Sequence, residues 1–111
     1  MQYTVSEHKR VALVVIEEEA LGAYNAEEFA AVLQEQLDNG YKNIIVDLSR
    51  VARLQTRAIA VLIEVLKHTR EKGGDVHLCD LSDKVAEVLD MTGLTAVFNI
   101  HADQVAAVGS F

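Results

Sequence analysis

The side chains best suited to chemistry lie in one short stretch of the chain. It holds the hydroxyl group of Thr56, with the guanidinium groups of Arg53 and Arg57 on either side. The pattern predicts a strand end, a loop and the first turn of a helix, where the helix dipole disfavours an exposed cation by about 0.3–1 kcal/mol. Two explanations are open: carboxylates at positions 17–19 or at Glu28 neutralise the arginines, or an acidic partner docks there.

Elsewhere the reactive side chains form no recognisable motif. The single cysteine, Cys79, lies in an apolar run, which predicts a buried and reduced thiol. No nucleotide-binding or nucleophile motif occurs, and no carboxylate pair is marked for acid–base catalysis. Spacings typical of metal ligands are also absent from the four histidines, His8, His68, His77 and His101. The sequence therefore predicts a binding protein that is not an enzyme, with no metal and no cofactor.

Charge and length limit the class of partner. The chain has 111 residues and a formal net charge of -7, which argues against nucleic acid as a partner. The acidic excess is uneven, because residues 50–72 carry six basic and two acidic side chains. No apolar stretch approaches the ~20 residues of a membrane span, so we expect no membrane insertion and a cytoplasmic location.

The elements that must position Thr56 follow from periodicity and from helix-ending residues. An apolar run at 11–16 and a weaker alternation at 2–7 predict a hairpin, after which strands and helices alternate. Further strands are expected at 43–48, 75–79 and 96–100, and helices at 26–39, 56–72, 83–92 and 103–108. Helical crossovers imply parallel pairing of the later strands. The prediction is a single α/β domain over residues 1–111, with a mixed sheet of four to five strands and about four helices.

The first expected helix has a recognisable start. Asn25 is followed three residues later by Glu28, which is the spacing of a capping box. We therefore expect the Asn25 side chain to cap this helix. For the second helix, Thr56 itself is a candidate N-cap.

The stretch around Thr56 also resembles a family signature. Residues 47–59 read Asp-Leu-Ser-Arg-Val-Ala-Arg-Leu-Gln-Thr-Arg-Ala-Ile, which is similar to the Asp-Leu-Ser-x-Val-x-Phe-Ile-Asp-Ser-Ser-Gly-Leu run of the STAS domain family. Residues 21–26 (Leu-Gly-Ala-Tyr-Asn-Ala) resemble the family's Leu-Asp-Ala-x-Asn-Ala segment, and residues 81–85 and 89–94 resemble its later part. The resemblance covers nearly the whole chain and is strongest to the anti-sigma factor antagonists.

This resemblance implies a regulatory binding role in bacterial transcription. In the family, the first serine of the signature is phosphorylated by a partner that is both anti-sigma factor and serine/threonine kinase. The unphosphorylated domain captures that partner, and the phosphorylated domain releases it. Thr56 occupies the position of that serine. Three neighbours differ from the signature, since Gln55 replaces an aspartate, Arg57 a serine and Ala58 a glycine.

Two functional hypotheses follow from the resemblance. The first is an anti-sigma factor antagonist that is switched by phosphorylation of Thr56. Its expected partner surface consists of Tyr24, Asn25, Arg53, Gln55, Thr56, Arg57 and Ala58. The alternative is a constitutive STAS-type adaptor subunit of an ABC transporter or of a sensory scaffold, without phosphorylation. A homodimer is compatible with either hypothesis.

Overall fold

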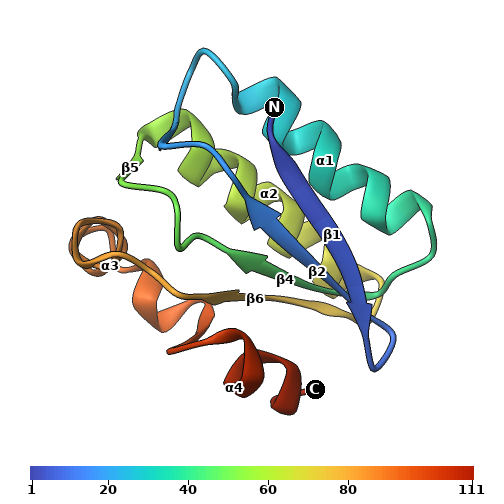
Figure 1. The fold of residues 1–111 in the computed structure, drawn as a ribbon. Coiled ribbons are helices and arrows are strands. Elements are labelled where there is room, and N and C mark those ends of the chain that lie inside the picture. The colour runs from blue at the N-terminus through green and yellow to red at the C-terminus, as the bar shows by residue number, and fades with distance from the viewer.

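The computed structural model describes residues 1–111, and a mixed β-sheet with helices on both faces dominates it (Figure 1). Its strand order is β1-β2-β4-β6-β7. These strands are β1 (Tyr3–His8), β2 (Val11–Ile16), β4 (Asn43–Asp47), β6 (Asp75–Cys79) and β7 (Asn99–His101). β1 is antiparallel to β2, and every other neighbouring pair is parallel. The predicted α/β architecture is confirmed.

Four α-helices surround the sheet, as expected. They are α1 (Ala26–Asp38), α2 (Thr56–Glu71), α3 (Asp83–Met91) and α4 (Gln104–Gly109). Figure 1 shows α1 and α2 on one face and α4 on the other. The main buried core joins α1, α2 and α3 to the sheet, whereas only a small apolar cluster lies beneath α4. Most of the hydrophobic stabilisation therefore comes from the core that includes α2, the helix that begins at Thr56. None of the helices is long and apolar enough to cross a membrane.

A second, very small sheet was not predicted. β3 (Ala20–Leu21) pairs in parallel with β5 (Arg53–Leu54), so that the segment before α1 lies beside the segment before α2. Two residues are too few to show an alternating pattern in a sequence. This pairing is the feature that brings the two expected functional segments together.

Three local predictions were wrong. Asn25 precedes α1 but makes no capping hydrogen bond, because its side chain is engaged within its own loop, and Glu28 binds the N-terminal amine of Met1 instead. Thr56 is the first residue of α2 and not its cap, since the N-cap position is held by Gln55. The last strand lies at 99–101 and not at 96–100, because a 3₁₀ helix (η1, Leu94–Ala96) precedes it.

Candidate functional site

The backbone on both sides of Thr56 is held firmly to the β3 segment. The amide of Gln55 donates to the carbonyl of Leu21 at 2.8 Å, and the amide of Arg53 donates to the carbonyl of Glu19 at 3.1 Å. Together with the β3–β5 pairing, these bonds fix the loop that leads into α2. Thr56 is therefore displayed from a rigid position, as a recognition site requires.

The hydroxyl of Thr56 lies at the positive end of α2. Thr56, Gln55 and Arg57 are all exposed, and the first turn of the helix carries no acidic side chain. The amides of Ala58 and Ile59 already donate to the carbonyl of Gln55, at 3.0 and 3.1 Å. An anion attached to the Thr56 hydroxyl would lie near the positive end of the helix dipole, which favours it.

The two arginines beside Thr56 have no acidic partner within the protein. Both Arg53 and Arg57 are exposed, and neither forms a salt bridge. The carboxylate of Glu28 pairs with the N-terminal amine at 2.6 Å, and that of Glu18 accepts from the amide of Gln2 at 2.7 Å. Internal neutralisation of the arginines is therefore wrong, and their positive charge is available to an external anion.

An exposed aromatic side chain stands on the neighbouring loop. Tyr24 is 70% exposed, and its hydroxyl donates to the carbonyl of Ala20 at 3.0 Å. Ala20 is the β3 residue that pairs with Arg53. The tyrosine is thus tied to the same small sheet that positions the arginine, and it presents an aromatic surface of the kind enriched in protein interfaces.

Asn25 has a structural part in this loop. Its side chain is only 4% exposed. The amide nitrogen Nδ2 donates to the carbonyl of Ala20, and Oδ1 accepts from the amide of Gly22, both at 3.0 Å. Both ends of the Asn25 amide group therefore brace the turn that carries Tyr24.

Gly22 is a site residue that the sequence reasoning missed. A Cβ atom at this position would lie 1.9 Å from Oε1 of Gln55, so the glutamine side chain lies directly over the glycine. The contact joins the turn before α1 to the residue before Thr56. The signal in the sequence was only the glycine of the Leu-Gly-Ala run, which does not reveal which side chain covers that glycine.

The structure separates the seven expected surface residues into two groups. Tyr24, Arg53, Gln55, Thr56 and Arg57 are exposed on adjoining segments. Asn25 and Ala58 are buried, so their side chains do not reach the surface. The arrangement has a hydroxyl, two cations and an aromatic ring, which can bind an acidic surface, and it offers no acid–base pair for catalysis.

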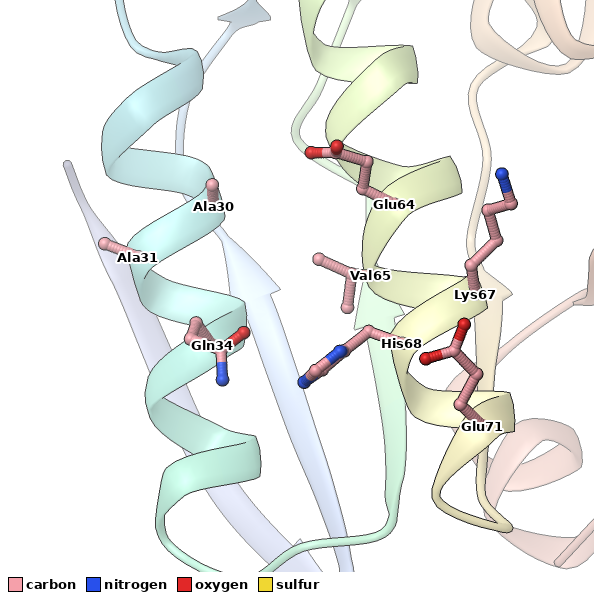
Figure 2. A pocket seen from close by; sticks show the side chains of 8 residues that line it. All are labelled: Ala30, Ala31, Gln34, Glu64, Val65, Lys67, His68 and Glu71. Carbon is pink, nitrogen blue, oxygen red and sulfur yellow. The ribbon is translucent and has the colours of Figure 1, made fainter.

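A groove between α1 and α2 lies farther along the helices from Thr56. Ala30 and Ala31 leave space on α1, and His68 and Gln34 point into the gap between the helices (Figure 2). Lys67 projects away from that gap. His68 is the only imidazole in the groove, and it has no hydrogen-bonded carboxylate to orient it, so the groove has no assembled catalytic set.

Proteins of similar sequence are named as anti-sigma factor antagonists. BtrV of Bordetella bronchiseptica, named as an anti-sigma factor antagonist, is 31% identical over 87 residues, which cover 78% of this chain and 75% of BtrV. The anti-sigma F factor antagonist of Paenibacillus polymyxa is 24% identical over 103 residues, which cover 92% of this chain and 88% of that protein.

Solved structures agree with the fold. The crystal structure of a Thermotoga maritima protein described as an anti-sigma factor antagonist superimposes with a TM-score of 0.87 at 24% identity, covering 97% of this chain and 92% of that one. The antagonist SpoIIAA in its unphosphorylated form gives a TM-score of 0.78 at 15% identity, covering 96% and 93%. Residues 2–107 match the STAS domain, and the chain therefore belongs to the STAS domain family.

Proposed function

We propose that this protein is an anti-sigma factor antagonist. It binds an anti-sigma factor that is also a serine/threonine kinase, and phosphorylation of Thr56 releases that partner. The observation that carries the proposal is the exposed Thr56 hydroxyl at the first position of α2, between two arginines without acidic partners. The names of the relatives support the regulatory class. A regulatory role of this kind depends on binding alone and requires no catalytic group in this protein.

The unmodified surface suits a partner with acidic groups and an apolar pocket. Arg53 and Arg57 supply the cationic contacts, and Tyr24 supplies a large aromatic surface on a braced loop. Aromatic and arginine side chains are the residues that most often dominate the energy of an interface. The partner can therefore dock across β5, the first turn of α2 and the turn before α1 without rearranging them.

Phosphorylation would change the charge of this surface without changing the fold. A phosphate adds about -1.5 to -2 charges and three acceptor oxygens. Within the protein, the α2 dipole and the two arginines favour that charge. Against an acidic partner, the same charge neutralises the arginines and adds a desolvation cost, and a loss of about 3 kcal/mol weakens binding more than 100-fold.

The three departures from the family signature fit this mechanism. Gln55 takes the place of an acidic side chain and leaves no negative charge next to the acceptor hydroxyl. Arg57 places a cation directly after Thr56, where it can pair with a phosphate. Ala58 is fully buried beneath the first turn, so its methyl group does not obstruct the surface.

Titration of the partner kinase, isolated from the source cell, tests the proposal. We expect Thr56→Glu to weaken binding at least tenfold and Thr56→Ala to retain it, with both variants folded. Thr95→Glu is the matched control, because Thr95 is also exposed and lies on η1. Equal affinities for Thr56→Glu and Thr95→Glu would refute the switch. A stable complex with a transporter or scaffold subunit, with Thr56 unmodified, would identify a constitutive adaptor instead.

A further inference from the structure

Two histidines meet at the edge of the sheet that α4 covers. His77 lies on β6 and His101 on β7, and the pairing of these parallel strands places Cys79 opposite His101. Nε2 of His101 is 3.1 Å from Nδ1 of His77, although the residues are 24 positions apart in the chain. His77 is only 6% exposed, whereas His101 is half-buried and faces outward in part.

The partners of His77 determine which of its nitrogens is free. Oδ2 of Asp75 lies 3.2 Å from Nε2 of His77, so an ionised Asp75 accepts a hydrogen bond from the N–H at that position. In this tautomer Nδ1 carries the lone pair of the neutral ring, and it lies 2.8 Å from the hydroxyl oxygen of Ser110 and 3.1 Å from Nε2 of His101. The Ser110 hydroxyl can donate either to Nδ1 or to the carbonyl of Ala107, 2.6 Å away, so it does not need the lone pair of Nδ1.

We propose that His77 and His101 form a binding site for a divalent transition-metal ion, with Nδ1 of His77 and Nε2 of His101 as its ligands. Without the ion, the N–H at Nε2 of His101 donates to Nδ1 of His77. When the ion binds, this proton leaves Nε2 and Nδ1 of His101 takes one up, so His101 stays neutral, no net proton is released, and no group is oxidised or reduced. The oxygen of Ser110 is available as a third donor, and water completes the coordination.

The distance between the two nitrogens is short enough for one ion to bind both. With metal–nitrogen bonds of about 2.0–2.1 Å, a separation of 3.1 Å corresponds to an angle of about 95–102° at the metal. That angle lies between the values for square-planar or octahedral ions and for tetrahedral ions, so one ion can bind both nitrogens in either geometry. Nitrogen ligands bind Cu²⁺ more tightly than the other divalent first-row ions, so we expect Cu²⁺ to bind this site most tightly.

The groups around His77 hold its imidazole ring in the way that neighbours of metal-bound histidines do. Asp75 holds the second nitrogen of His77, as carboxylates do for metal-bound histidines, and Arg70 in turn holds Asp75 at 3.1 Å. The ring of Phe111 stacks on His77 with centroids 4.0 Å apart and fixes the imidazole plane.

Copper titration of the full chain at pH 7.5 tests this site, with calorimetry for the affinity and electron paramagnetic resonance for the ligands. We expect one strong site per chain whose spectrum shows two imidazole nitrogens. His101→Gln should weaken it at least tenfold, and Asp75→Asn should weaken it about 10- to 100-fold. His68→Gln, which changes an exposed histidine in the groove between α1 and α2, should leave the affinity unchanged.

Several outcomes would overturn the proposal. An affinity that His101→Gln leaves unchanged, or a spectrum without two nitrogen ligands, means that copper binds elsewhere or only adventitiously. Zn²⁺ bound as tightly as Cu²⁺ contradicts the assignment of Cu²⁺ as the preferred ion. His101 is chosen over His77 because it is half-exposed on the edge strand, so the variant should fold, which circular dichroism verifies.

Discussion

Replacing Asn25 by alanine should destabilise the protein through its loop and not through helix α1. The Asn25 side chain is buried and makes two hydrogen bonds of 3.0 Å, one to the carbonyl of Ala20 and one from the amide of Gly22. After the substitution, Ala20 retains the hydrogen bond from Tyr24. The amide of Gly22 loses the acceptor that Asn25 provided, in a buried turn.

The magnitude follows from these contacts. An unsatisfied buried donor costs about 1–3 kcal/mol, and the second lost bond adds about 0.5–1.5 kcal/mol, so we expect Asn25→Ala to lower the free energy of unfolding by about 1.5–4.5 kcal/mol. At about 4 °C per kcal/mol for a domain of this size, the melting temperature should fall by about 6–18 °C. Urea denaturation followed by circular dichroism measures the loss. Asn39→Ala is the control, because Asn39 is exposed at the other end of α1 and should change the stability by less than about 0.5 kcal/mol.

The variant Asn25→Ser distinguishes the two hydrogen bonds of Asn25 within its loop, which brace the turn, from a helix cap. Serine caps helices as well as asparagine does, so a capping role predicts almost full stability for this variant. The brace needs both an amide donor and a carbonyl acceptor with the reach of asparagine, so the structure predicts that serine is nearly as harmful as alanine. Wild-type stability in Asn25→Ser, or a loss below about 0.5 kcal/mol in Asn25→Ala, would refute the reasoning.

Two further predictions concern a close backbone contact and a buried thiol. Gly74→Ala would place a Cβ atom 1.7 Å from the backbone oxygen of Lys42, so we expect a loss of about 3 kcal/mol or more in urea denaturation. Gly73→Ala should cost only about 1–2 kcal/mol, because its Cβ meets open space and only its φ of +84° is unfavourable; equal losses at the two glycines would contradict the steric argument. Burial raises the pKa of the Cys79 thiol, assisted by the charge of Asp47, so native protein at pH 8 should not react with Ellman's reagent, whereas protein in urea should react at once. Rapid labelling of the native thiol would show that the face beneath α4 is open.

The sequence revealed those parts of the fold that depend on long, regular patterns. The apolar runs at 11–16 and 43–48 and the spacing of apolar residues in α2 identified the sheet and its main helices. Ser82, a residue type that often caps helices, accepts a hydrogen bond from the amide of Val85 at the start of α3.

Two kinds of feature were not accessible to this reasoning. Asn25 has the composition and spacing of a helix cap, but its side chain binds Ala20 and Gly22, five and three positions before it, and only the folded chain shows that choice. The β3–β5 pairing and the contact of Gln55 with Gly22 join residues more than 30 positions apart, which no local pattern reveals. The position of Thr56 could be predicted from local pattern, whereas the structures that hold its surface in place could not.

The occupancy of phosphate on Thr56 in the partner-bound and free pools of the native protein tests the central claim most directly. Both pools are isolated from the source cell under phosphatase inhibition, and the peptide that contains Thr56 is quantified by mass spectrometry. If phosphorylation releases the partner, the bound pool carries unmodified Thr56 and the phosphate is confined to the free pool. Equal phosphate occupancy in the two pools, or none in either, would contradict the phosphorylation switch at Thr56.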